Sequence, residues 1–284
     1  MRGKGLAFGA ATVVNAMPSG YGAALGVNLK TEAEVELVDG PEIEVEIKGD
    51  ARESGTLAAE AFKITLERFG IRKGGRIKTE SEIPIAVGMK SSSAAANAVM
   101  LATLDALGKK LGDLEVIKMG VEASIRAGVT VTGAFDDACA SYLGGLHVTD
   151  NYGRRILKSI EVEPLSAVFL VPEGKRYSGQ VDAQRLKAYA RPSLLALDDA
   201  LNGRHWQAML LNGMVMARAF DADPMPMLMA LKNGAISAGF CGKGPAVCAI
   251  VSMESEGEVV DGWRGLGWRI IRSRTNSSSA RQGW

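Results

Sequence analysis

Cysteine and histidine are scarce in this chain. Its 284 residues include three cysteines, Cys139, Cys241 and Cys248, and two histidines. No two cysteines form a C-x-x-C pair, so neither a disulfide framework nor a cysteine zinc site is expected. Because the chain has only two histidines, a Ser-His-Asp triad or a histidine-rich metal site is not expected. This cysteine usage is typical of a protein of the reducing cytoplasm.

Long apolar runs and an excess of one charge are also missing. No apolar stretch reaches the ~18 residues that suggest a membrane span, so a membrane protein is not expected. The net charge of +1 gives no polyanion-binding surface, which argues against nucleic acid as a partner. The oligomeric state cannot be predicted from these features.

Hydrophobic periodicity predicts a mixture of strands and helices. The alternating segment 27–37, the turn "DGP" and the alternating segment 42–48 together predict a β-hairpin. Helices are expected at 55–69, 92–107, 113–126, 136–143, 182–189, 193–202, 205–219 and 225–232. Short strands follow at 235–240, 245–252 and 268–274, and the tail from residue 275 is expected to be loose.

This pattern predicts an α+β fold with mixed or antiparallel sheets. The second half of the chain is richer in helices than the first. A domain boundary is therefore expected near residue 160, with residues 1–160 forming one domain and residues 161–284 the other.

The stretch "GMKSSSAAA" at 88–96 places a glycine, a lysine and three serines where a helix begins. The start of a helix has backbone N–H groups without internal partners and a positive dipole, which together suit a phosphate group. Gly88 would let such a ligand approach closely. The alternative is an ordinary capped helix, with Ser91 or Ser92 as the N-cap.

Two further stretches could act with this serine loop. "GAFDDACASYLGG" at 133–145 offers Asp136 and Asp137, and a carboxylate near a phosphate site can accept a hydroxyl proton or hold a metal. "GFCGKGPAVCAIV" at 239–251 is a glycine-rich turn before an apolar strand. Taken singly, the first stretch could be a helix cap and the second a plain hairpin.

In this order the three stretches resemble the GHMP kinases, the superfamily of galactokinase, homoserine kinase, mevalonate kinase and phosphomevalonate kinase. That family's motif P-x-x-x-G-L-G-S-S-A-A is matched by "PIAVGMKSSSAA" at 84–95. Its motif S-G-x-G-P-x-V is matched loosely by "AGFCGKGPAV" at 238–247. The resemblance spans nearly the whole chain and implies a two-domain GHMP-kinase fold, with the active site between the domains.

Two features resemble the archaeal-type shikimate kinase branch. They are Lys90 within the serine loop and the opening "ATVVNAMPSGYGAALGVNLKTEAEV" at 11–35. The resemblance implies ATP- and Mg²⁺-dependent phosphorylation of shikimate to shikimate 3-phosphate, in the chorismate pathway to the aromatic amino acids. Another GHMP kinase, such as homoserine kinase, and a catalytically inactive nucleotide-binding relative remain alternatives.

The resemblance also implies roles for single residues. The ATP phosphates would be wrapped by Ile85, Ala86, Val87, Gly88, Met89, Lys90, Ser91, Ser92, Ser93, Ala94 and Ala95. Ser92 and Glu122 would hold magnesium, unless Glu122 only forms a helix ion pair with Arg126, four residues on.

Asp136 would accept or orient the proton of the attacking hydroxyl. Asp137 is the competing choice, although helical geometry turns its side chain roughly 100° away. The first-strand lysine of many mevalonate kinases is absent, and Thr12 takes its place. Catalysis would then rest on positioning and on charge neutralisation by magnesium and Lys90.

The substrate side of the predicted site is less defined. Asn15, Ser19, Gly242 and Gly244 are expected to bind substrate. A substrate carboxylate needs a basic partner. Nothing in the sequence selects one from the candidates Arg176, Arg185, Arg191, Arg272 and Arg274.

Overall fold

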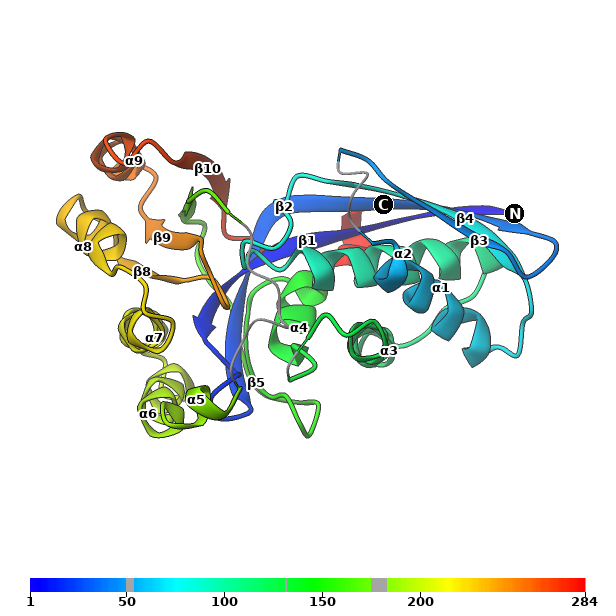
Figure 1. Cartoon of the computed structure of the whole chain (residues 1–284), viewed down its shortest axis with the longest axis horizontal. Helices are drawn as coiled ribbons and strands as arrows, with labels where there is room; N and C mark the ends of the chain where they lie inside the picture. Colours follow the sequence, from blue (N-terminus) through cyan, green and yellow to red (C-terminus); the bar gives the residue numbers. More distant parts are fainter. Residues whose placement is uncertain (50–53, 131, 175–182, 284) are drawn as a thin grey trace.

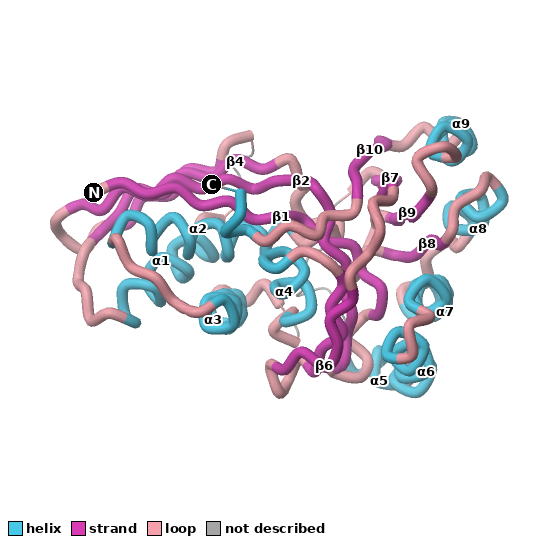
Figure 2. The backbone as a smooth tube through the Cα atoms, turned by 180° about the vertical axis from the view of Figure 1, so that it is seen from behind, coloured by secondary structure: helices cyan, strands magenta, loops and turns pink. Residues whose placement is uncertain are grey.

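The computed structural model describes residues 1–49, 54–130, 132–174 and 183–283, and these residues form two β-sheets with helices packed against them (Figures 1 and 2). The first sheet contains β1 (Arg2–Val14), β2 (Tyr21–Val38), β3 (Ile43–Ile47), β4 (Gly74–Ser81), β5 (Leu146–Asp150) and β6 (Arg155–Ile160). The second contains β7 (Ser166–Val171), β8 (Ser237–Phe240), β9 (Val247–Val251) and β10 (Arg269–Arg274). The predicted α+β class with mixed sheets is confirmed.

Helices cover one face of each sheet. Those of the first half are α1 (Thr56–Arg68), α2 (Ser91–Leu107), α3 (Asp113–Arg126) and α4 (Phe135–Leu143), and in Figure 1 they lie under the long strands. Those of the second half are α5 (Ala183–Lys187), α6 (Ala190–Leu201), α7 (His205–Ala219), α8 (Met225–Lys232) and α9 (Glu256–Arg264). No helix in the described parts of the chain is long and apolar enough to cross a membrane.

The alternation in β2 fixes which face of the first sheet is covered. Ala33, Val35 and Leu37 are buried against the helices, whereas the glutamates between them face outward. The outward Glu34 pairs with Lys4 of β1 at 2.8 Å between Oε1 and Nζ. The charged face is therefore a solvated surface, and the apolar face builds the core.

Helix α2 lies directly against β1. A Cβ atom on Gly5 would sit 2.0 Å from the backbone oxygen of Ala98, so only glycine permits this approach. The close packing aligns α2 along β1. It thereby fixes the position of the N-terminus of α2, where the serine loop lies.

The predicted hairpin of 27–37 with 42–48 is wrong. Strand β3 pairs in parallel with β4, and β4 lies between β3 and β2. Helix α1 connects β3 to β4 and buries Phe62 in the core under the sheet. The burial of this amphipathic helix favours a crossover connection over a two-stranded hairpin.

Two further differences lie near the C-terminus. Helix α9 was not expected, although Val259, Val260 and Trp263 have helical spacing and are buried. The tail is not loose, because Asn276 exchanges backbone hydrogen bonds with Gly26 and Gly145, at 2.9 and 2.7 Å. A short 3₁₀ helix, η2 (Ala280–Gly283), follows, and Ala280 is fully buried.

The chain changes from the first sheet to the second between residues 160 and 166. A domain boundary near residue 160 stays a prediction. The return of the tail to the first sheet adds residues 275–283 to the first half, and both termini lie there in Figure 1.

Candidate active site

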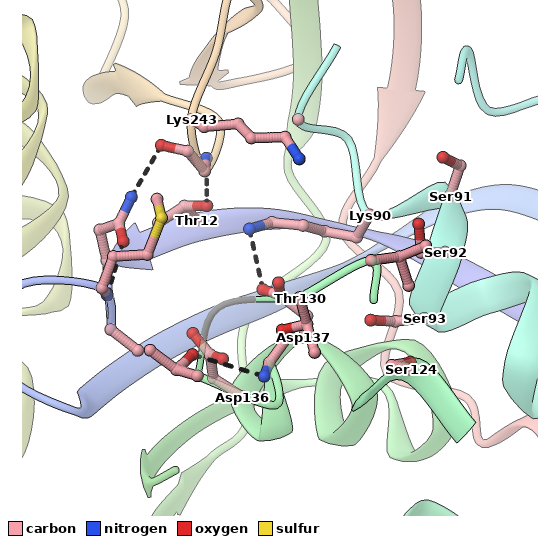
Figure 3. A pocket seen from close by; sticks show the side chains of 18 of the residues that line it. Thr12, Lys90, Ser91, Ser92, Ser93, Ser124, Thr130, Asp136, Asp137 and Lys243 are labelled. Carbon is pink, nitrogen blue, oxygen red and sulfur yellow. Dashed lines mark hydrogen bonds and ion pairs between the residues drawn. The ribbon is translucent and has the colours of Figure 1, made fainter. Parts of the chain in front are cut away.

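One pocket gathers residues from all three sequence stretches singled out above. It is lined by Thr12 and Asn15 from the end of β1, Ala86, Gly88 and Lys90 to Ser93 from the serine loop, Ser124 from α3, Asp136 and Asp137 from α4, and Gly242 and Lys243 from the β8–β9 turn, together with Ala16, Met17, Val129, Thr130, Thr132 and Ala134 (Figure 3). The pocket therefore lies between the two halves of the chain.

The serine loop leads into an uncapped helix. Lys90 is the N-cap of α2 in a left-handed conformation, with φ of 68°, and no side chain caps the first turn. The first intrahelical bond there runs from Ala94 N–H to the Lys90 carbonyl, so the N–H groups of Ser91 to Ser93 have no partner within the helix. The capped-helix alternative is wrong, and the uncapped donors suit phosphate oxygens.

The predicted phosphate-binding residues divide into two groups. Ala86, Gly88 and Lys90 to Ser93 line the pocket. Ile85, Val87, Met89, Ala94 and Ala95 do not line it, and Val87, Met89 and Ala94 belong to the core.

The backbone around the pocket is held in unfavourable conformations. Ala86, Lys90 and Ala134 all have positive φ, at 60°, 68° and 50°, and all three line the pocket. Such conformations cost about 1–3 kcal/mol each and persist only where the surrounding contacts enforce them. Their clustering is typical of a functional site.

Gly88 is needed for the packing of the two halves against each other. With φ of +90°, its missing Cβ would lie 1.9 Å from the carbonyl oxygen of Cys241. The N–H of Ala246 also donates to the Val87 carbonyl at 3.1 Å. The glycine therefore lets the β8–β9 turn of the second half rest on the serine loop, and its predicted role in ligand approach stays a prediction.

Lys90 and Asp137 form a buried ion pair, with 2.9 Å between Nζ and Oδ1. Their side chains are only 9% and 13% exposed. Burial lowers the pKa of Lys90, but the attraction of Asp137 and then of Asp136 outweighs burial, so its pKa is raised. The ammonium group of Lys90 is thus held charged on the carboxylate side of the pocket.

Asp136 lies beside this pair but is held by an amide. The side-chain nitrogen of Asn151 donates to its Oδ1 at 2.8 Å, and Asn151 Oδ1 accepts from the Asp136 N–H at 3.2 Å. Burial, followed by repulsion from Asp137, raises the pKa of Asp136 to about 7, and Lys90 offsets part of that rise. A carboxylate with a pKa near neutrality can take and release a proton.

Both aspartates line the pocket, so the expectation that Asp137 turns away is wrong. They occupy the first turn of α4. Ala134 precedes that turn in a left-handed conformation. The helix starts at the pocket wall, and consecutive side chains of its first turn both reach the cavity (Figure 3).

The structure does not bring Glu122 to the pocket. Its carboxylate lies 3.1 Å from Arg154 and 3.6 Å from Arg126. The pocket side of α3 is instead taken by Ser124, two residues further on and about 200° around the helix. Among the described residues no cluster of three or more histidine, cysteine, aspartate or glutamate side chains could hold a metal.

Only some of the predicted substrate-binding residues line the pocket. Asn15 and Gly242 line the pocket, and the Asn15 amide donates to the Gly242 carbonyl at 2.7 Å. Ser19 and Gly244 do not line it, and the Ser19 hydroxyl bonds the backbone of Tyr21. Of the candidate arginines, Arg176 lies outside the described residues, and Arg185, Arg191, Arg272 and Arg274 do not line the pocket.

Three residues that line or support the site were not predicted, and of these only Lys243 lines the pocket. Lys243 stands in the glycine-rich turn that the sequence marked out, but it was not singled out as a functional residue. Asn151 follows the buried strand β5, and Asn212 lies inside α7, with no motif around either one. Asn212 accepts a bond from the Asn15 N–H at 2.9 Å, so it supports the site from the second half.

An uncapped helix start beside buried carboxylates is the arrangement expected of a small-molecule kinase. The family model for the GHMP kinases N terminal domain matches residues 56–145. The shikimate kinase of Methanothrix thermoacetophila is 44% identical over 100% of this chain and 97% of its own length. That of Thermococcus kodakarensis is 45% identical over 91% of this chain and 94% of its own length. The chain belongs to the GHMP kinase family, in the group that contains these shikimate kinases.

Solved structures agree on the fold. The mevalonate kinase of Methanococcus jannaschii superposes with a TM-score of 0.76 over 97% of this chain and 98% of its own, at 15% identity. The galactokinase of Lactococcus lactis, complexed with galactose, gives 0.76 over 98% and 94%, at 12% identity.

Proposed function

We propose that this protein transfers the γ-phosphoryl group of ATP to a hydroxyl of shikimate, giving shikimate 3-phosphate and ADP. The observation that carries the proposal is the uncapped N-terminus of α2, which shares one pocket with Asp136 and with the Lys90–Asp137 pair. The whole-length similarity to proteins named shikimate kinase supports the choice of acceptor.

The N–H groups and hydroxyls of Ser91 to Ser93 are proposed to hold the ATP phosphates. Ser92 is exposed at the pocket and is proposed to contribute an oxygen to Mg²⁺. The ion, when bound on the phosphates, supplies charge neutralisation. A site with few protein ligands suits magnesium, which keeps waters and substrate oxygens in its shell.

Asp136 is proposed to accept the proton of the attacking hydroxyl. As the new oxygen–phosphorus bond forms, the bond from the γ-phosphorus to the bridging oxygen of ADP breaks, and the proton passes to the carboxylate. Lys90 holds Asp137 and places positive charge beside the reacting oxygens. Phosphoryl transfer depends mainly on such positioning and charge stabilisation.

We also propose that the reaction takes place in the reducing cytoplasm. The cysteines Cys139, Cys241 and Cys248 are free and buried.

The direct test is a coupled ADP-release assay of the purified protein with ATP, magnesium and one acceptor at a time. Shikimate should release ADP, whereas homoserine and mevalonate should give only background. Release with homoserine or mevalonate but not with shikimate would assign another acceptor. Release with none of the three would favour the catalytically inactive relative.

A further inference from the structure

Lys243 is a cation that the second half of the chain contributes to the pocket. Its turn is fixed on two sides. The Gly242 N–H donates to the Thr12 hydroxyl at 2.7 Å, and the Gly242 carbonyl accepts from the Asn15 amide at the same distance. On the other side, the turn rests on Val87 and Gly88 of the serine loop. The backbone of Lys243 is therefore placed by residues of the first half.

The two lysine side chains enter the pocket from opposite walls and pass one another in Figure 3. A Cβ on Gly242 would lie 3.0 Å from Lys90 Nζ, so the Lys90 ammonium reaches the turn that carries Lys243. Burial and then repulsion from Lys90 lower the pKa of Lys243 to about 8, and Asp137 offsets part of this effect. Two ammonium groups in one half-buried space repel one another, and a bound anion relieves that repulsion.

The Lys90 ammonium is held by Asp137, so it is oriented towards the carboxylates. The turn of Lys243 is instead docked on the loop that opens into the N-terminus of α2. An anionic group at that N-terminus would meet helix N–H groups from one half and the Lys243 ammonium from the other. This is the arrangement that stabilises charge on a phosphoryl group in transfer.

We propose that Lys243 contacts the γ-phosphoryl group of the nucleotide and stabilises its charge during transfer. The proposal rests on the function proposed above, but it adds a catalytic residue from the second half of the chain. The other anion that an ammonium at this position would bind is the carboxylate of the acceptor. The experiment is therefore designed to separate these two sources of negative charge.

The variant to make is Lys243→Met, with Lys232→Met, at the exposed end of α8, as the matched control. Binding of ADP and of a non-hydrolysable ATP analogue is measured with magnesium, and kcat and KM for shikimate are measured alongside. Lys243→Met should lower kcat by about 10²-fold. It should weaken binding of the analogue but not of ADP and leave KM for shikimate near normal. Lys243→Arg should recover part of the analogue affinity.

A raised KM for shikimate with unchanged analogue binding would assign Lys243 to the acceptor carboxylate and overturn the proposal. An equal loss of ADP and analogue binding would also overturn it, because the contact would then not involve the γ-phosphoryl group. The comparison of the two nucleotides needs no turnover. It still decides the role of Lys243 if shikimate proves not to be the acceptor, and a thermal midpoint near that of the control shows that the variant is folded.

Discussion

At the scale of single residues, the burial that suits Asp136 to proton transfer also lowers the stability of the folded protein. It is 3% exposed, and its pKa is raised from 3.8 to about 7. Between these two values the folded protein binds a proton that the unfolded chain releases. The free energy of unfolding therefore falls as the pH rises from about 4 to about 7, and it stays lower above that range. A buried carboxylate with this penalty is typical of a functional group.

Asp136→Asn should remove that penalty and the reaction together. Turnover should fall about 10²–10⁴-fold, because no group accepts the hydroxyl proton. Thermal unfolding at pH 8 should occur at a higher temperature than in the wild type, and the difference should shrink at pH 5. Asp137→Asn is the matched control. It leaves Lys90 buried without its partner and should lower the midpoint. Near-normal turnover in Asp136→Asn would show that Asp136 is not the base, and a more severe loss in Asp137→Asn with an unchanged thermal midpoint would favour Asp137.

Substitutions of Ser92 and Glu122 should differ in their effect on the magnesium concentration that activity requires. Ser92→Ala should raise the magnesium concentration needed for half-maximal activity, because Ser92 lines the pocket at the proposed phosphate site. Glu122→Ala should leave it unchanged, since that carboxylate lies on Arg126 and Arg154. Titration of activity against magnesium measures both. A shifted titration in Glu122→Ala would show that the residue leaves its arginines when nucleotide binds.

At the scale of elements, local periodicity predicts where the helices lie better than it predicts which strands pair. Helices α1, α2 and α3 lie within a residue of their expected bounds, because apolar spacing and glycine breaks are local signals. The partner of β3 depends on how α1 packs, which no local pattern contains. The same limit applies to the site. The motifs located the serine loop and Asp136, but which side chain of α3 faces the pocket, and the inward direction of Lys243, follow from packing between distant segments.

Strand β2 positions the proposed base through a missing side chain. A Cβ on Gly22 would lie 2.4 Å from Asp136 Oδ2 and 2.9 Å from the Ala16 side chain. Gly22→Ala should therefore displace the carboxylate and lower kcat at least tenfold, with KM for ATP changed little. Gly257→Ala in α9, where the added Cβ meets nothing within 4 Å, is the control and should be fully active. Full activity in Gly22→Ala would show that the carboxylate position does not matter to turnover.

At the scale of the whole molecule, a network of buried hydrogen bonds joins the two halves of the chain at the pocket. Asn212 of α7 accepts from the Asn15 N–H, and Asn15 donates in turn to Gly242. The turn that carries Lys243 thus depends on a helix of the second half and a strand of the first. A substitution that breaks this network should lower the stability and the catalytic rate together.

Asn212→Ala tests this coupling. It leaves the Asn15 N–H buried without an acceptor, which costs about 1–3 kcal/mol, so the thermal midpoint should fall by several degrees. The rate should also fall, because Asn15 no longer fixes the turn. Asn202→Ala, an exposed amide bonded to Asp198 in its own helix, is the control. A variant that loses stability but keeps its full rate would separate the support of the fold from that of the site.

The return of the tail to the first sheet has a consequence for how the protein is made. The carbonyl of Gly26 and the N–H of Gly145 both bond to Asn276. During synthesis these backbone groups emerge long before their partner, and a buried polar group left without a partner is unfavourable. The half of the chain that is translated first therefore forms these hydrogen bonds only after the other half has been translated. Its folding cannot be complete until residue 276 has been synthesised.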